Sequence, residues 1–322
     1  MCALRLAERG AQALVLESEL AGASPSRTAS RAAAGMLGPL SETLVERASV
    51  HPRLLELGID SLDLWRARAD TLGLNAFPAR GARLVGFSQG DIGRVHQRAH
   101  AFGRELVEQR GEAIIACEAA IDPEAALAAL ERAIADHRGE VRRGAQVNAI
   151  SRNQVDLRDG SHERADVIVL ATGAWSPALQ GASFTPVKGQ ILEARSDALQ
   201  PGETMRAPSI YAVGRAPGRI IIGATMEEGR ADLSTDAATI DRLLQTARAM
   251  HPSLADAQLV RAWAGVRPMS ADGAPRIGRV GEAIIAAGHS RNGWLLAPIT
   301  AEIVCAHAFE EDIQDLWAAF DP

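Results

Sequence analysis

The sequence predicts an α/β fold: a Rossmann-like nucleotide-binding domain that lacks its first strand and glycine loop, joined to a β-rich α+β domain. Three observations support this. Residues 3–17 read as a helix, a glycine and a short apolar strand that ends in an acid, which is the second half of a βαβ unit. Residues 165–173 are an apolar run into a glycine, typical of a buried parallel strand whose carboxyl end approaches a ligand. Residues 185–230 read as several short strands.

The acid that ends the first apolar strand is Glu17. In dinucleotide-binding folds a strand running into G-x-G-x-x-G precedes the first helix, and an Asp or Glu about 20 residues later holds the adenosine ribose. Glu17 stands where that acid belongs, although a charged residue that simply ends a strand is the alternative. The first strand and its glycines would lie before Met1, so we expect the chain to be truncated at its N-terminus relative to this fold.

The later elements follow from periodicity and from cap and turn residues. Small side chains dominate residues 32–36, and such a run permits close backbone approach to a ligand or to another helix. Asp122 as N-cap and Pro123 at the first helical position mark a helix over residues 122–137. We also expect helical segments up to about residue 74, helices at 91–110, 236–250 and 294–307, a hairpin at 147–157, and strands at 82–87, 187–194, 210–213, 219–223 and 283–287.

Crossover-type segments interrupted by a β-rich insertion predict two discontinuous domains. The nucleotide-binding domain would comprise residues 1–75, 120–185 and 262–322. The substrate domain would comprise residues 76–119 and 186–261.

Composition excludes several classes of protein. With 322 residues, 47% of them hydrophobic and 23% charged, the chain can bury a large core, and no apolar run reaches the roughly 18 residues of a membrane span. A net charge of −6 makes nucleic acid an unexpected partner. Three cysteines without metal or disulfide spacing fit a reducing cytoplasm. The sequence leaves a homo-oligomer open.

Six motifs are more specific than these patterns. They are Thr28-Ala-Ser-Arg-Ala-Ala-Ala-Gly-Met36, Ala171-Thr-Gly-Ala-Trp175, Pro186-Val-Lys-Gly-Gln190, Gly223-Ala-Thr-Met-Glu227, Gly265-Val-Arg-Pro268 with Ser270-Ala-Asp-Gly-Ala-Pro-Arg-Ile-Gly278, and Gly288-His-Ser-Arg-Asn-Gly-Trp-Leu-Leu-Ala-Pro298. Together they resemble the FAD-dependent D-amino acid oxidase superfamily, and within it the glycine oxidases of thiamin biosynthesis. The resemblance runs from residue 1 to about 309 and is poor between residues 87 and 121.

The resemblance implies a substrate site. Arg267 matches the family arginine that binds the substrate carboxylate, and an arginine fork can do so bidentately. Tyr211, the only tyrosine, matches a family tyrosine that binds the same carboxylate, although Gly214 replaces the proline of the family's Y-x-V-P-R. Arg291 would lie near substrate and flavin, and Met226 would form an apolar wall. Each residue also has a plainer alternative role. Arg267 could form a surface salt bridge, and Tyr211 could lie in the core. Arg291 could be an ordinary loop arginine, and Met226 could simply pack against its neighbours.

The resemblance also implies non-covalently bound FAD. A helix N-terminus favours the negative charge that a reduced flavin develops at its N1–C2 edge, and residues 293–296 open such a helix. The residues implied to contact the cofactor are Glu17, Ser30, Ala34, Gly35, Met36, Val147, Thr172, Gly173, Asn292, Gly293 and Leu295.

The resemblance implies oxidative deamination of glycine or another small amino acid to the 2-oxo acid, ammonia and hydrogen peroxide, with oxygen as the second substrate. Three alternatives stay open. The chain could oxidise sarcosine or D-amino acids, it could be a dehydrogenase that passes electrons to another acceptor, or it could be an inactive fragment that does not hold FAD because the glycine loop is missing.

Overall fold

A computed structural model of the chain describes residues 1–20, 22, 26, 28–45, 50–74, 76–78, 81–109, 111–175 and 184–322. The helices are α1 (Cys2–Glu8), α2 (Ala29–Ala32), α3 (Pro39–Glu42), α4 (Leu54–Thr71), α5 (Gln89–Ala101), α6 (Pro123–Asp136), α7 (Ala237–Met250), α8 (Gly293–Ala308) and α9 (Asp315–Ala318), with 3-10 helices at Gly173–Trp175 and Pro252–Leu254.

The strands outnumber the helices. They are β1 (Leu14–Glu17), β2 (Met36–Leu37), β3 (Ala82–Leu84), β4 (Leu106–Gln109), β5 (Glu112–Ile115), β6 (Ala119–Ala120), β7 (Glu140–Arg143), β8 (Val147–Ser151), β9 (Gln154–Leu157), β10 (His162–Arg164), β11 (Ile168–Leu170), β12 (Thr185–Arg195), β13 (Thr204–Arg206), β14 (Tyr211–Ala216), β15 (Arg219–Gly223), β16 (Glu227–Glu228), β17 (Gln258–Met269), β18 (Arg276–Val280) and β19 (Ala283–Ala287).

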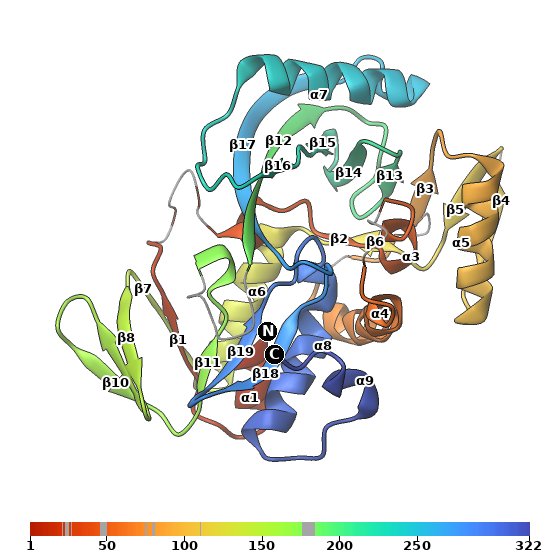
Figure 1. The fold of residues 1–322 in the computed structure, drawn as a ribbon. Helices are drawn as coiled ribbons and strands as arrows, with labels where there is room; N and C mark the ends of the chain where they lie inside the picture. The colour runs from red at the N-terminus through yellow and green to blue at the C-terminus, as the bar shows by residue number, and fades with distance from the viewer. Residues whose placement is uncertain are drawn as a thin grey trace.

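The lower half of the molecule in Figure 1 has the parallel pairing expected of a nucleotide-binding fold. Strand β1 pairs in parallel with β7, β11 pairs in parallel with β19, and β18 adds to β19 in antiparallel orientation. Side chains of α1, α4, α6 and α8 form its main core, in which Leu57, Leu62 and Trp65 are fully buried. The parallel sheet therefore has helices packed on it, as the sequence predicts.

The upper half is a mixed sheet covered by α7 (Figure 1). Its strand order is β16-β12-β15-β14-β13-β3-β5-β4, and β17 pairs along β12 in antiparallel orientation. The apolar face of α7, including Ile240 and Leu244, packs on β12, β14 and β15 in a second core. The two halves together confirm the predicted α/β class with a sheet-rich second part, whereas the domain boundaries stay predictions.

The start of α6 and three strands agree with the sequence predictions. Asp122 caps α6 by accepting hydrogen bonds from the Glu124 and Ala125 amides, and Pro123 is the first helical residue, as predicted. The strand predictions at 187–194, 219–223 and 283–287 are confirmed by β12, β15 and β19.

One prediction of secondary structure is wrong, and one strand is missed. The helix expected over residues 91–110 ends at Ala101, and Leu106–Gln109 is strand β4, because the chain turns at Gly103, where φ is +63°. The strand missed by the sequence analysis is β17, whose polar residues interrupt the apolar alternation. The long register with β12 stabilises that strand instead.

Helix α8 contains a proline, and neighbouring side chains replace the backbone hydrogen bonds that this proline disrupts. Pro298 has no N–H for the Trp294 carbonyl, which instead accepts a hydrogen bond of 2.6 Å from Trp65 Nε1. Ser61 Oγ donates to the Leu295 carbonyl at 2.6 Å and accepts from the Ile299 amide at 3.3 Å. These bonds fix the start of α8 on α4.

Within the described part of the chain, no helix has the length and apolar character needed to cross a membrane.

We expect Trp65→Phe to lower the free energy of unfolding by about 1–3 kcal/mol, because it leaves the buried Trp294 carbonyl without a donor while keeping an aromatic ring in the core. Denaturant unfolding measures this change. Trp175→Phe, at an exposed position, is the control and should change stability by less than about 0.5 kcal/mol. Equal effects of the two substitutions would contradict the assigned role of Trp65.

Candidate active site

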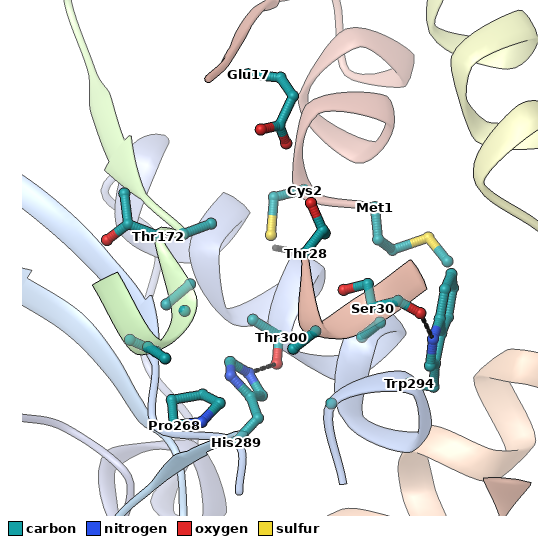
Figure 2. A pocket seen from close by; sticks show the side chains of 18 of the residues that line it. Met1, Cys2, Glu17, Thr28, Ser30, Thr172, Pro268, His289, Trp294 and Thr300 are labelled. Atoms are coloured by element: carbon teal, nitrogen blue, oxygen red, sulfur yellow. Dashed lines mark hydrogen bonds between the residues drawn. The ribbon is translucent and has the colours of Figure 1, made fainter. Parts of the chain in front are cut away.

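A large cavity lies between the two halves of the molecule. Its volume is about 1770 Å³, and its wall includes the carboxyl ends of β1 and β11, residues 28–36 and parts of β12, β14, β17 and α8 (Figure 2). The predicted site residues that line it are Glu17, Ser30, Ala34, Gly35, Met36, Val147, Thr172, Gly173, Tyr211, Met226, Arg267, Arg291 and Gly293. Residues far apart in the sequence thus meet around one space.

Two predicted cofactor residues lie outside the cavity wall. Asn292 is the residue that precedes the first turn of α8, and Leu295 is buried in the main core with its side chain near Gly58. The other side chain on this turn, Trp294, does line the cavity. Contact of Asn292 or Leu295 with a cofactor stays a prediction.

Arg267 lies on β17 and its guanidinium packs across the neighbouring strand. A Cβ atom at Gly189 of β12 would overlap this guanidinium, so only glycine leaves room for it. Arg267 Nη1 donates to the Thr225 carbonyl at 3.2 Å, and the Tyr211 side chain lies close enough to the guanidinium to raise its pKa. Burial lowers the pKa of Arg267, whereas Tyr211 and the more distant Glu42 counteract that effect. The result is a fixed cation on the cavity wall.

A buried carboxylate holds two further arginines beside Arg267. Glu42 Oε1 lies 2.9 Å from Arg291 Nε, and Glu42 Oε2 accepts a hydrogen bond from Arg206. Burial by itself would raise the pKa of Glu42, but Arg206 and Arg291 hold it below its ordinary value. Glu42 and Arg206 both line the cavity. The local sequence offers no signal for this pairing, because the partners come from α3, β13 and the turn before α8.

A second buried carboxylate organises the start of α3. Glu118 Oε1 accepts hydrogen bonds from the Leu40 and Ser41 amides at 2.6 and 2.8 Å. Burial raises the pKa of Glu118 to about 7, although the Ser41 contact and Arg206 lower it in part. Glu118 therefore supports the segment that carries Glu42, and sequence reasoning missed it as well.

Residues 30–36, which we call the small-residue run, line the cavity except at Arg31. Side chains from other segments donate hydrogen bonds to several of its backbone carbonyls. Trp294 Nε1 donates to the Ser30 carbonyl at 2.8 Å (Figure 2), and Trp263 Nε1 donates to the Ala32 carbonyl at 2.9 Å. Arg215 donates to the Ala34 carbonyl at 3.3 Å. Side chains from three distant segments thus hold this run, and its small side chains leave space on the cavity side.

The opposite end of the cavity carries the strand-end residues. Glu17 and Thr172 come from the carboxyl ends of β1 and β11 and face the same space (Figure 2). Glu17 Oε1 also accepts a hydrogen bond of 2.9 Å from the Glu19 amide. Glu17 is therefore both a turn-stabilising strand end and a carboxylate on the cavity wall, so the two alternatives raised by the sequence are compatible.

His289 is a cavity residue that the sequence did not single out as a site residue. Its Nε2 atom lies 2.9 Å from Thr300 Oγ1 (Figure 2), and burial lowers its pKa to about 4. The imidazole is therefore neutral near pH 7. The preceding Gly288 has a φ of +73°, a backbone conformation that glycine adopts without strain.

Comparison with known proteins identifies the family. Residues 1–307 match the family described as FAD dependent oxidoreductase, or DAO. The chain belongs to this family. Glycine oxidase of Bacillus licheniformis is 35% identical over 161 residues, which are 48% of this chain and 44% of that protein. The bifunctional protein ThiO/ThiG of Synechocystis is 34% identical over 213 residues, which are 63% of this chain and 32% of that protein.

Solved structures agree with this assignment. Glycine oxidase of Geobacillus kaustophilus superposes with a TM-score of 0.85 at 28% identity, covering 99% of this chain and 94% of that chain. Iminodiacetate oxidase of Chelativorans superposes with a TM-score of 0.83 at 20% identity, covering 100% and 95%, which shows a shared fold. The predicted resemblance, the fold class and the FAD-dependent oxidoreductase class are thereby confirmed.

The cavity fits FAD, the cofactor of the family. Its wall offers a carboxylate, Glu17, suited to ribose hydroxyls at one end. At the other end it offers the N-terminal turn of the long helix α8 at Gly293, where free amides favour negative charge. Between them, the small-residue run leaves room for a planar ring. Glu17, residues 30–36, Thr172 and Gly293 would hold FAD without a covalent bond.

We expect Gly35→Ala to destabilise the chain and weaken FAD retention. Gly35 has a φ of +80°, and a Cβ atom there would overlap the Ile121 carbonyl. Gly10→Ala is a matched control, since Gly10 has a φ of +91° with nothing within 4 Å of the added atom. Gly35→Ala should cost about 1–3 kcal/mol more unfolding free energy than Gly10→Ala. Equal losses in thermal unfolding and equal flavin absorbance would disprove the tight contact.

Glu118 predicts a pH-dependent stability. Its folded pKa of about 7 lies above the ordinary 4.5, so the folded chain keeps a proton that the unfolded chain releases, and stability falls as pH rises through this window. In Glu118→Gln this decline is absent, and the variant gains up to about 1.4 kcal/mol per pH unit relative to the parent. Urea unfolding at pH 5, 6 and 7 tests this, with the exposed Glu105→Gln as a control that should show no such trend.

Proposed function

We propose that the chain uses FAD to oxidise the C–N bond of glycine or another small amino acid, yielding the 2-oxo acid, ammonia and hydrogen peroxide. The observation that carries this proposal is the pair formed by Arg267 and Tyr211 on the cavity wall. The names of the relatives point to the same substrate class. Because the alignments cover 44% and 32% of the first two relatives cited above, the activity is stated as a proposal.

The arginine cluster supports binding of a carboxylate. Arg267, Arg291 and Arg206 surround one carboxylate, Glu42, so the local charge is positive. Arg267 presents a planar fork to the cavity, and a substrate carboxylate can bond it bidentately. The Tyr211 hydroxyl lies beside this fork and can donate to the same carboxylate. Such binding orients the α-carbon toward the space that the small-residue run leaves open.

The remaining residues fit oxidation without a side-chain base. FAD, when bound, supplies the hydride acceptor and reacts afterwards with oxygen. The substrate amine must be neutral to react, and the neutral His289 adds no charge to this wall. Met226 closes part of the cavity with an apolar surface, although 39% of its own surface is exposed. The chain therefore binds, orients and shields the amino acid.

A link to thiamin biosynthesis is part of the proposal. It rests on the relatives named ThiO/ThiG, in which a similar segment belongs to a bifunctional protein. The imine formed first from glycine would hydrolyse to glyoxylate and ammonia. A cytoplasmic location and a homo-oligomeric state stay predictions.

We expect Arg267→Ala to lower kcat/KM for glycine by the equivalent of about 2–5 kcal/mol, because it removes the buried partner of the carboxylate. Tyr211→Phe should cost about 0.5–1.5 kcal/mol, the contribution of one hydrogen bond. The assay follows hydrogen peroxide under air with glycine, sarcosine and D-alanine, in chain saturated with FAD.

Arg158→Ala, at an exposed position on the turn after β9, is the control and should keep full activity. Unchanged turnover in Arg267→Ala would refute the site assignment. Substrate-dependent flavin reduction without peroxide would favour a dehydrogenase. Absence of flavin absorbance at 450 nm after gel filtration would favour the inactive-fragment alternative.

A further inference from the structure

The strand that supports Arg267 also carries a buried amide side chain, Gln190. Gly189 and Gln190 are consecutive residues of β12, so their side-chain positions lie on opposite faces of the sheet. The Arg267 guanidinium packs against Gly189, whereas Gln190 on the other face has 2% of its surface exposed. The proposed reaction gives Gln190 no role. A buried amide needs partners for its hydrogen bonds, and those partners show what it does.

Both polar atoms of the Gln190 amide are hydrogen-bonded. Its Nε2 atom donates to Glu227 Oε1 at 2.8 Å, and its Oε1 atom accepts from the Asp236 backbone amide at 2.7 Å. Glu227 belongs to β16, which pairs with β12 (Figure 1), and Asp236 is the N-cap of α7. The two bonds therefore fasten the chain to β12 on both sides of the connection between β16 and α7.

Thr225 connects this amide with Arg267. Thr225 Oγ1 donates to Glu227 Oε1 at 2.7 Å, the same oxygen that Gln190 bonds, and accepts from the Gln190 backbone amide at 2.9 Å. The Thr225 amide donates to the Gln190 carbonyl at 3.2 Å. The Thr225 carbonyl in turn accepts the hydrogen bond of 3.2 Å from Arg267 Nη1. An unbroken series of hydrogen bonds thus runs from the Gln190 amide to the guanidinium.

The charge of Glu227 gives this series one direction. Burial by itself would raise the pKa of Glu227, but hydrogen bonds from Thr225 and Gln190 hold it below its ordinary value. An ionised carboxylate only accepts hydrogen bonds, so the Thr225 hydroxyl donates toward Glu227 and keeps its lone pairs for the Gln190 backbone amide. The network therefore has one arrangement of donors, and it holds Thr225 in one place.

We propose that Gln190 is a positioning residue for the substrate carboxylate: through Glu227 and Thr225 it holds the Arg267 guanidinium in the orientation that receives this carboxylate. The inference rests on the proposed function, because it requires that Arg267 bind the substrate. Gln190 does not line the cavity and does not touch the reacting atoms. Orienting Arg267 in advance lowers the cost of binding, so the contribution of Gln190 belongs to KM and not to kcat.

The test compares substrate turnover with carboxylate binding in chain saturated with FAD. Gln190→Met keeps the length of the side chain and removes both amide bonds. We expect KM for glycine to rise about three- to tenfold, the effect of one lost hydrogen bond, while kcat stays within about twofold. The Kd of acetate, a carboxylate without an amine, should rise by the same factor in calorimetric titration. Thr225→Val, which removes the hydroxyl and keeps the carbonyl, should act in the same direction.

Glu193→Gln is the matched control on the same strand. Glu193 is buried, bonds Arg219 and Arg261, and does not line the cavity. Its substitution should lower Tm but leave KM and the Kd of acetate within about twofold of the parent values. Thermal unfolding of every variant shows that each is folded, so a loss of stability alone is separated from a loss of orientation.

A double variant tests whether Gln190 acts through Arg267. In an Arg267→Ala background, Gln190→Met should lower kcat/KM for glycine by less than about twofold further, because the guanidinium that it positions is gone. Two independent contributions would instead multiply in full.

Three results would overturn the inference: unchanged KM and acetate affinity in both Gln190→Met and Thr225→Val, an equal rise of KM in Glu193→Gln, or full multiplication in the double variant. If acetate binds weakly to Arg267→Ala but normally to Gln190→Met, the inference alone fails and the proposed function stands. If Arg267→Ala itself binds acetate and glycine normally, both fail.

Discussion

The pairing of β12 with β17 is the interaction on which the rest of the site depends. In this antiparallel register Gly189 lies opposite Gly265, and Val187 lies opposite Arg267. The absence of a side chain at Gly189 lets the Arg267 guanidinium lie across the strand, and the absence of one at Gly265 lets Ala32 approach. One backbone ladder therefore places both the Arg267 cation and the small-residue run on the cavity wall.

Charge in the cavity is controlled by carboxylates as much as by arginines. Glu42 is shared between Arg206 and Arg291, which positions both side chains while leaving the group cationic as a whole. Glu118 in turn holds the helix on which Glu42 lies, through the amides of Leu40 and Ser41. The substrate carboxylate of the proposed function would enter an environment that already favours negative charge, so its binding would require little reorganisation.

Helix α8 connects the main core with the site. Pro298 leaves backbone groups without helical partners, and Ser61 and Trp65 of α4 supply those partners. The same turn presents Trp294, whose indole bonds the Ser30 carbonyl at the cavity wall. One helical turn therefore connects packing in the core, through Trp65, with the cavity wall at Ser30.

The sequence by itself determined those features whose cause is local. Asp122 and Pro123 define the start of α6, apolar runs define β12 and β19, and the Gly-Val-Arg-Pro motif singles out Arg267. Tertiary structure decided the rest. The bond between Arg206 and Glu42 joins residues 164 positions apart, the depressed pKa of His289 comes from burial, and β17 exists through its ladder with β12. Such contacts have no local signature, because they form only when distant segments come together and exclude water.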